Sequence, residues 1–190
     1  MEKRIGTFFF KHNYTAESDA RLVELITTGN QKAFEELIHR YQRAVINFAF
    51  RFIGSREDAK DIAQETFIRF FQAANRYEPS AQFKTYLFRI TTNLCIDFKE
   101  KKKPEYMDEL PETYSSSTPF KELHQKEISE TISKAVHSLP ENQRVALLLH
   151  HFEGMKYAEI AGVMNTSVSA VESLLVRAKK TLREKLKLFQ

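Results

Sequence analysis

AGVMNTSVSAVESLL, residues 161–175, is the stretch that decides the fold. Its helical pattern of apolar residues is interrupted at Asn165 and restarts at Val168. Asparagine is, after glycine, the residue that enters the left-handed region most readily, and the two hydroxyl side chains that follow can cap a new helix. Ala161 is small enough to let a second helix cross the first. The stretch therefore predicts a helix-turn-helix unit, closed by two branched apolar residues of the second helix, Val171 and Leu174.

The second helix of this unit has two chemically different sides. We expect its buried side to consist of Val168, Val171, Leu175, Ala178 and Leu182. The other side carries small polar groups near the start of the helix and cations further along. Such a helix suits the major groove of DNA, where early residues meet base edges and later ones meet phosphates. An ordinary helical hairpin with a solvated basic face is the alternative interpretation.

Helical periodicity continues over the rest of the chain, which has only five glycines and five prolines in 190 residues. Apolar residues recur every three or four positions in segments that end at Gly29, at Gly54 and close to Pro79. A further segment, with Thr85 as its expected cap, leads to a basic run at residues 99–103. The sequence therefore predicts an all-α protein.

Changes in composition divide the chain into parts. Residues 104–122 are acidic and contain proline and a run of serines, which indicates a flexible linker. We expect an N-terminal helical bundle over residues 18–103 and a C-terminal helix-turn-helix domain over residues 123–190. Residues 1–17 form an N-terminal extension to which the sequence assigns no role. The predicted architecture is two small helical domains joined by a linker.

The charge and cysteine content narrow the possible partners and compartment. Lys and Arg outnumber Asp and Glu by 29 to 25, and the resulting net charge of +4 is compatible with a polyanionic partner. A single cysteine, Cys95, excludes an intramolecular disulfide and fits a reducing compartment. No apolar run reaches the roughly 20 residues that span a bilayer. We therefore expect a soluble, cytoplasmic protein with no membrane insertion.

Nothing in the sequence points to catalysis. The chain has no glycine-rich phosphate loop, and the adjacent His150 and His151 would point to different faces of a helix, unlike the i, i+4 pair of a helical metal site. We expect no metal, no cofactor and no enzymatic activity. Both histidines and Cys95 are expected to be packing or surface residues.

Two further blocks carry a family resemblance. DAKDIAQETFIRFF (58–71), followed by FKTYLFRITTNLCIDF (83–98), resembles the second conserved region of bacterial sigma factors. LPENQRVALLLHHFEGMKYAEIAGVMNTSVSAVESLLVRAKKTL (139–182) resembles their fourth region. The order of the blocks, with the third region reduced to a linker, is similar to the extracytoplasmic-function (ECF) group. The resemblance implies a factor that binds core RNA polymerase, recognises the −10 and −35 promoter elements and assists strand opening. A stand-alone helix-turn-helix regulator that binds DNA without polymerase is the alternative.

The resemblance implies a polymerase contact on the third predicted helix. In the family, the DIAQE sequence docks on a coiled coil of the polymerase's largest subunit. Taken without the family, an exposed stripe of acidic and polar residues more often indicates simple solvation. The residues to which the resemblance gives this role are Asp58, Asp61, Gln64, Glu65 and Arg69.

The resemblance also implies that the fourth predicted helix and the loop before it read the promoter element nearest the start site. Aromatic side chains next to cations can stack on an extruded base and hold its phosphates. Tyr86 and Phe88 could instead be core residues. Primary sigma factors have paired tryptophans here, whereas this chain has Arg89 and Ile90 and no Trp, so we expect strand opening to depend on a good promoter match. The expected contact residues are Arg76, Phe83, Lys84, Tyr86, Phe88, Arg89, Asn93 and Lys99.

The resemblance assigns the distal promoter element to the second helix of the opening stretch. Family members often have a basic residue where Glu172 stands, and a carboxylate there can accept a hydrogen bond from cytosine N4. Base contacts are expected from Ser169, Ala170, Glu172 and Ser173, and phosphate contacts from Arg177 and Lys180.

Two further expectations rest on the family. Its linker threads the RNA channel of the polymerase, although an acidic linker can equally be a plain tether. Its members are commonly held inactive by an anti-sigma factor, so the resemblance implies such a partner.

Overall fold

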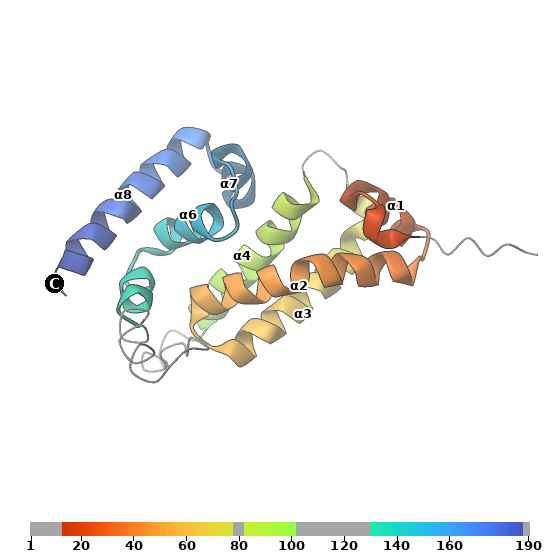
Figure 1. The fold of residues 1–190 in the computed structure, drawn as a ribbon, viewed down its shortest axis with the longest axis horizontal. Helices are drawn as coiled ribbons and strands as arrows, with labels where there is room; N and C mark the ends of the chain where they lie inside the picture. The colour runs from red at the N-terminus through yellow and green to blue at the C-terminus, as the bar shows by residue number, and fades with distance from the viewer. Residues whose placement is uncertain (1–12, 78–81, 102–129, 188–190) are drawn as a thin grey trace, which may run out of the picture.

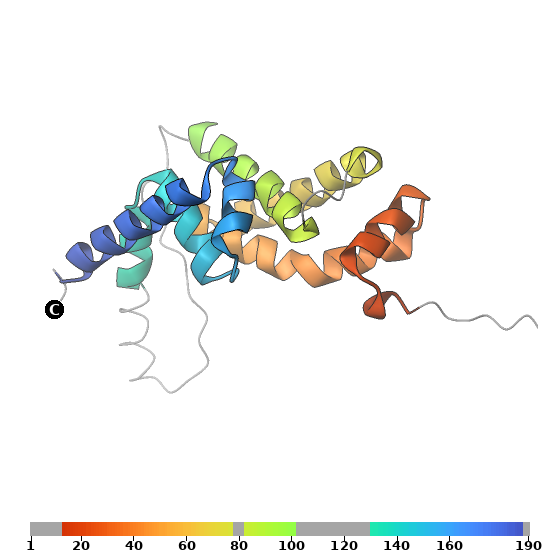
Figure 2. The same ribbon diagram turned by 90° about the horizontal axis from the view of Figure 1, so that it is seen from above.

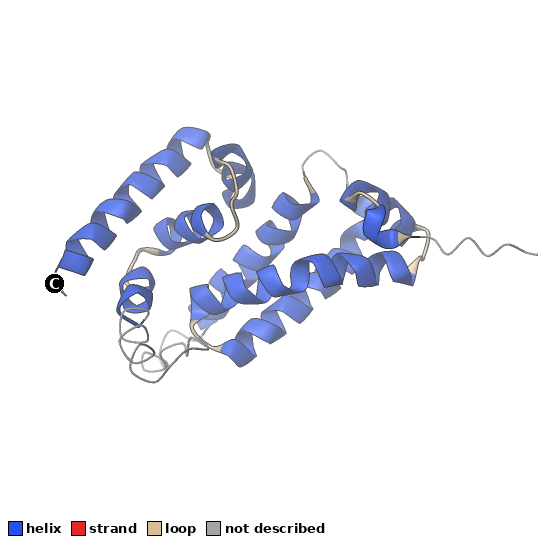
Figure 3. Ribbon diagram, viewed as in Figure 1, coloured by secondary structure: helices blue, strands red, loops and turns tan. Residues whose placement is uncertain are grey.

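The computed structural model describes residues 13–77, 82–101 and 130–187, and every regular element within these ranges is helical (Figures 1 and 3). This confirms the predicted all-α class. Residues 104–122, which we expected to form a linker, and residues 1–12 of the expected N-terminal extension lie outside the described residues. Within the described ranges, no helix combines the length and the apolar character needed to cross a membrane.

The N-terminal half, residues 13–101, consists of helices that begin at conventional caps. Ser18, Asn30 and Ser55 each accept a hydrogen bond from the backbone amide three residues later. Thr85 is not a cap as expected: it lies inside the last helix and is buried. The elements are η1 (Tyr14–Ala16), α1 (Asp19–Thr27), α2 (Gln31–Ile53), α3 (Arg56–Ala73), η2 (Ala74–Arg76) and α4 (Phe83–Lys101).

The C-terminal half, residues 130–187, contains the helix-turn-helix unit. Residues 130–137 are helical and are followed by α6 (Glu141–His151), α7 (Tyr157–Met164) and α8 (Val168–Lys187). Asn165 ends α7 in the left-handed region, with φ 49° and ψ 51°, as its sequence position predicts. Ser167 then caps α8 by accepting the amide of Ala170 at 3.1 Å. The expected buried side of α8 holds for Val171, Leu175 and Ala178, but Val168 is 48% exposed because it stands at the first position of the helix.

The hydrophobic core does not divide at the boundary between the two halves. One cluster lies within the N-terminal half and joins α1, α2, α3 and α4. The other spans both halves and brings Phe52 and Phe88 together with Leu148 and Ile160. In both views α7 lies beside α4 (Figures 1 and 2), and the two helices are in contact. This packing of the C-terminal half on α4 was not predicted from the sequence.

Candidate functional site

The residues expected on the third predicted helix share the outer surface of α3. Asp61, Gln64 and Arg69 are exposed, and Asp58 and Glu65 are half-buried. Arg69 donates from Nε to the Glu65 carboxylate at 2.8 Å, and both side chains are close to half exposed. An exposed i, i+4 pair of this kind contributes only about 0.3–0.5 kcal/mol. The pair orders two long side chains on the surface more than it stabilises the fold.

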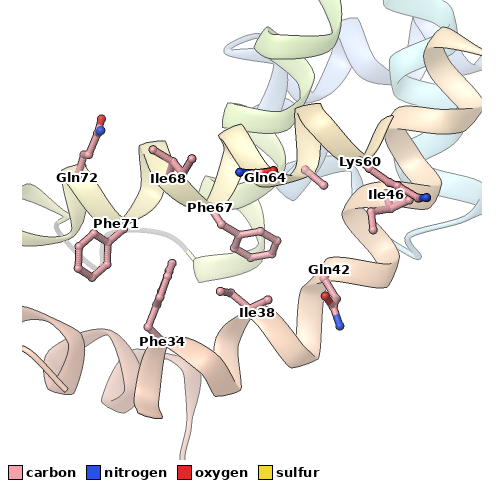
Figure 4. Close-up of a pocket in the computed structure, with 11 residues that line it drawn as sticks. Phe34, Ile38, Gln42, Ile46, Lys60, Gln64, Phe67, Ile68, Phe71 and Gln72 are labelled. Carbon is pink, nitrogen blue, oxygen red and sulfur yellow. The ribbon is translucent and has the colours of Figure 1, made fainter. Parts of the chain in front are cut away.

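An apolar groove of about 450 Å³ lies between α2 and α3, next to the polar stripe (Figure 4). Phe34 of α2 and Phe71 of α3 point toward one another across it, with ring centroids 4.9 Å apart. Ile68 is 41% exposed and Phe71 is 52% exposed, which is unusual for large apolar side chains on a surface. Gln64 belongs to both the stripe and the groove wall. Sequence reasoning missed the groove because Phe34 and Phe71 fit the apolar period of their helices.

Two of the aromatic residues expected to contact DNA are core residues in the structure. Phe88 is fully buried and packs edge-to-face on Phe48 at 5.5 Å. Phe83 is 4% exposed and packs edge-to-face on Phe70 at 4.9 Å. A side chain enclosed on all sides cannot stack on an extruded base, so the expected base contact is wrong for both residues in this structure.

Tyr86 remains available, together with an aromatic partner that sequence reasoning had not singled out. It is half-buried, and its ring centroid lies 4.9 Å from that of Tyr77, which stands at the end of η2. Burial raises the pKa of the Tyr77 hydroxyl. The exposed Arg76 is the preceding residue. The two rings thus lie together, and an exposed cation precedes one of them in the chain.

Two cations of α4, Lys84 and Arg89, are hydrogen-bonded within the protein. Arg89 donates from Nε and Nη2 to the backbone oxygen of Gly162 in α7, at 3.0 and 2.6 Å. Lys84 donates from Nζ to the backbone oxygen of Glu153, which precedes α7. Asn93 is exposed. Lys84 and Arg89, which we expected to face DNA, thus face the C-terminal half.

Lys99, near the end of α4, is half-buried with its ammonium group 5.5 Å from the centre of the Phe52 ring. Burial, together with the positive charge of Arg144, lowers the pKa of Lys99 to about 8. At neutral pH the ammonium group is therefore still mostly protonated, but it loses its proton at a lower pH than an ordinary lysine does.

The outer face of α8 is open. Ser169, Glu172 and Ser173 are exposed at the start of the helix, with Ala170 half-buried among them. The exposed Arg177 and Lys180 follow one and two turns later, and Arg177 donates to the backbone oxygen of Ser173 at 3.1 Å. The structure thus brings all six residues expected at the distal element onto one accessible side of α8.

Arg144 is a buried residue that the sequence analysis did not identify. Only 4% of its surface is exposed, although it lies in α6 of the C-terminal half. It donates to the backbone oxygens of His137, Leu139 and Phe52, with distances of 2.9 Å to Leu139 and 3.1 Å to Phe52. Only one feature of the sequence hints at this burial: Arg144 directly precedes the apolar run 145–149. Helical periodicity alone is equally compatible with an exposed arginine at this position.

The described residues contain no group of three His, Cys, Asp or Glu side chains that could hold a metal ion. Cys95 is fully buried, and burial raises the pKa of its thiol. The His150 ring is 3.1 Å from the backbone oxygen of Met155 through Nδ1 and packs edge-to-face on Tyr157.

Comparison with known proteins gives two family matches. Residues 37–105 match the model of Sigma-70 region 2, and residues 121–182 match that of Sigma-70, region 4. The ECF RNA polymerase sigma-E factor of Haemophilus influenzae is 30% identical over 181 residues, which cover 89% of this chain and 95% of that protein.

Solved structures share the fold. CnrH in complex with the cytosolic domain of CnrY superposes with a TM-score of 0.72 at 25% identity, covering 92% of this chain and all of that one. The sigma factor RpoE of Bartonella quintana, solved in complex with the anti-sigma factor NepR, gives a TM-score of 0.69 at 21% identity, covering 84% and 99% of the two chains.

Proposed function

This chain belongs to the sigma-70 family, in its ECF group, and directs promoter-specific initiation of transcription; we propose that α3, α4 and α8 divide that work among them. Residues 18–103 act as region 2, which binds the polymerase and the proximal element, and residues 123–190 act as region 4, which binds the distal element. The linker of residues 104–122 connects them. The chemistry of RNA synthesis belongs to the polymerase, and the chain itself is not an enzyme.

The observation that carries this proposal best is the open face of α8. Its start presents exposed hydroxyl and carboxylate groups after the left-handed turn at Asn165, and its later turns present cations. Small polar groups at the start of a recognition helix reach base edges, and later cations reach phosphates. We assign base contacts at the −35 element to Ser169, Ala170, Glu172 and Ser173, and phosphate contacts to Arg177 and Lys180.

For core polymerase, we propose that α3 supplies a polar rim and the neighbouring groove an apolar centre. Asp61, Gln64 and Glu65 form the rim, with Asp58 and Arg69 beside it. The exposed apolar side chains of Ile68 and Phe71 give the groove the combination of apolar centre and polar surround that protein interfaces use. The partner is the polymerase's largest subunit.

For the −10 element, we propose a contact set centred on the start and outer side of α4. Tyr86 and Tyr77 supply stacking faces, and Asn93 supplies a polar group. Arg76, Lys84, Arg89 and Lys99 supply positive charge. Phe83 and Phe88 are left out of this set because their side chains are buried in the hydrophobic core.

We also propose that an anti-sigma factor regulates the chain. Support comes from the fold shared with RpoE, which was solved in complex with the anti-sigma factor NepR. The partner's identity follows from no residue of this chain.

The proposed function is tested by reconstitution. Purified protein added to core polymerase is expected to start transcription at a dedicated promoter found by transcript mapping after overexpression. Alanine at Asp61, Gln64 and Glu65 together should abolish binding to core while the circular dichroism spectrum stays unchanged. Alanine at Arg21 and Glu24, an exposed ion pair on α1, is the matched control and should leave core binding intact. Specific footprinting by the free protein without any association with core would contradict the proposal.

A further inference from the structure

The apolar groove between α2 and α3 is large enough to hold more than one aromatic ring (Figure 4). Its volume is about 450 Å³. An apolar cavity of about 150 Å³ binds one benzene molecule, so the groove has room for about two or three rings. Ile68 and Phe71 in its wall remain 41% and 52% exposed, and covering such surface is favourable because it leaves water. The groove is therefore suited to a ligand that carries several aromatic side chains.

The described part of the chain begins beside one end of this groove. Arg40 of α2 holds η1 in place by donating from Nη2 to the backbone oxygen of Tyr14 at 3.0 Å. Asn30, the cap of α2, donates from Nδ2 to the Tyr14 hydroxyl at 3.1 Å. Phe34 in the groove wall follows Asn30 by about one helical turn, and its ring packs against the same core cluster as that of Tyr14. Residues 1–12 therefore join the structure close to the Phe34 end of the groove.

The sequence just before η1 contains the longest aromatic run of the chain, Phe8, Phe9 and Phe10. Phe10 precedes Tyr14 by four residues and Phe8 precedes it by six. An extended chain spans about 3.5 Å per residue, so the backbones of Phe10 and Phe8 can reach about 14 and 21 Å from Tyr14. Both reaches exceed the turn of about 5.4 Å that separates Phe34 from the Asn30 contact. The aromatic run is thus within reach of the groove.

Charges on the two surfaces favour the same pairing. The segment of residues 1–12 has three Lys or Arg residues and a single Glu, so it is basic. Over residues 58–69, α3 carries more carboxylates than cations beside the groove: Asp58, Asp61 and Glu65 against Lys60 and Arg69. Opposite charges around an apolar centre favour one partner and one orientation. An aromatic run flanked by cations therefore complements an apolar groove flanked by carboxylates.

We propose that the aromatic run of residues 8–10 docks in the groove between α2 and α3 of the same chain and covers it in the free protein. The effect on polymerase rests on the proposed function, in which this groove is the apolar centre of the contact with core. The run and the polymerase's largest subunit then compete for one surface. The free protein has to release the run before it binds core, so residues 1–12 lower its apparent affinity.

Tryptophan fluorescence of the purified chain tests the docking without any polymerase. The chain has no tryptophan, so Phe10→Trp introduces a single reporter. We expect a blue-shifted emission, as for a ring shielded from water, that moves to the solvent-exposed value when Phe71→Ser is added. Ile68→Ser, which alters the same groove at a second position, should move the emission in the same direction. Val176→Ser, at an exposed valine of α8, is the matched control and should leave it unchanged.

Three results would overturn the docking. Solvent-exposed emission in Phe10→Trp itself would show that the ring is not covered. Blue-shifted emission that neither groove variant changes would show that the ring is covered elsewhere. Emission that depends on protein concentration would show docking on a second copy and not within one chain. Circular dichroism of each variant identifies any loss of fold, which is why two groove substitutions are compared.

The competition is tested with a full-length variant that has serine at positions 8, 9 and 10. It should bind core polymerase about threefold or more tightly than the parent, because a groove that is covered for two thirds of the time loses about threefold in apparent affinity. Val176→Ser should bind as the parent does. Equal or weaker binding by the serine variant would overturn the competition. A chain that docks its aromatic run but fails to bind core at all would contradict the proposed function alone.

Discussion

Arg144 and Phe52 are 92 residues apart in the chain, and the Arg144 guanidinium donates a 3.1 Å hydrogen bond to the Phe52 backbone oxygen. The same guanidinium lies 5.2 Å from the centre of the Phe52 ring. Its other hydrogen bonds go to His137 and Leu139 in its own half. One buried side chain therefore closes the turn before α6 and joins that turn to the end of α2.

We predict that Arg144→Met lowers the free energy of unfolding by about 2–4 kcal/mol, because three buried carbonyl groups lose a charged donor. Arg144→Lys should recover only part of this, since an ammonium cannot reach three oxygens in a planar fork. Urea unfolding followed by circular dichroism measures both. Arg177→Met removes an exposed arginine and is the control. Equal stability of the Arg144→Met and Arg177→Met proteins would contradict the prediction.

Lys99 predicts a specific dependence of stability on pH. Its folded pKa of about 8 lies below the ordinary value of 10.5, so the unfolded chain binds more protons between these values. Stability contributed by this residue therefore rises as pH increases from about 8 to 10.5 and is constant below that window. The difference in unfolding free energy between the parent and Lys99→Met should show this rise, because subtraction removes other titrating groups. A flat difference would refute the assignment.

Because Asn165 has a left-handed backbone conformation, we predict that glycine at this position gives a more stable protein than alanine does. Asn165→Ala should lower stability by about 1 kcal/mol, because a β-carbon without a polar group strains this region. Asn165→Gly should be neutral or slightly stabilising. Thermal unfolding compares both with Thr166→Ala, a neighbouring exposed change. Greater loss with glycine than with alanine would show that the backbone at Asn165 differs from the structure.

Glu172 predicts a change in sequence preference and not in overall affinity. The exposed carboxylate stands among the base-reading positions of α8, where it can accept from one cytosine N4. Glu172→Ala should alter base preference at one position of the distal element by about 1–3 kcal/mol, whereas Arg177→Ala should weaken all sequences alike. Selection of promoter variants by the reconstituted holoenzyme measures both. An unchanged preference in Glu172→Ala would remove this residue from base recognition.

We predict that a substitution in the apolar groove weakens binding to core polymerase while the chain stays folded. Phe71 is 52% exposed, so Phe71→Ser should lower the unfolding free energy by about 1.5–2.5 kcal/mol, half the cost at a buried site, and leave the chain folded. It should weaken association with core polymerase about tenfold or more. Val176→Ser, at a 63% exposed valine of α8, is the matched control. Association is measured by competition with a labelled sigma factor. Full affinity in Phe71→Ser would exclude the groove from the interface.

Turns and helix caps that depend on neighbouring residues were predicted correctly from the sequence. The helix-turn-helix turn followed from Asn165, and the cap of the next helix followed from the hydroxyl side chains after it, of which Ser167 accepts the Ala170 amide. In each case the determining atoms are within four residues of one another. Backbone conformation at such sites is set by the side chain present, so one sequence is sufficient.

Relationships between distant helices could not be predicted in the same way. Phe88 and Tyr86 are both aromatic residues of α4 beside cations, yet one is fully buried and the other is not. Their difference depends on where Phe48 of α2 lies, which periodicity within α4 does not contain. Arg144 shows the same limit, because its partner Phe52 belongs to the other half.

The contacts of Lys84 and Arg89 with backbone oxygens have a consequence for ionic strength. A cation bound to a neutral carbonyl interacts with a dipole and not with a full charge, so salt weakens such a contact less than it weakens an ion pair. A cation bound to a DNA phosphate behaves oppositely, because each phosphate contact makes affinity fall steeply as salt rises. Lys84 and Arg89 donate to the backbone oxygens of Glu153 and Gly162 and so make contacts of the first kind. The contact between α4 and α7 is therefore expected to change little as salt is added, unlike contacts of the same cations with phosphate.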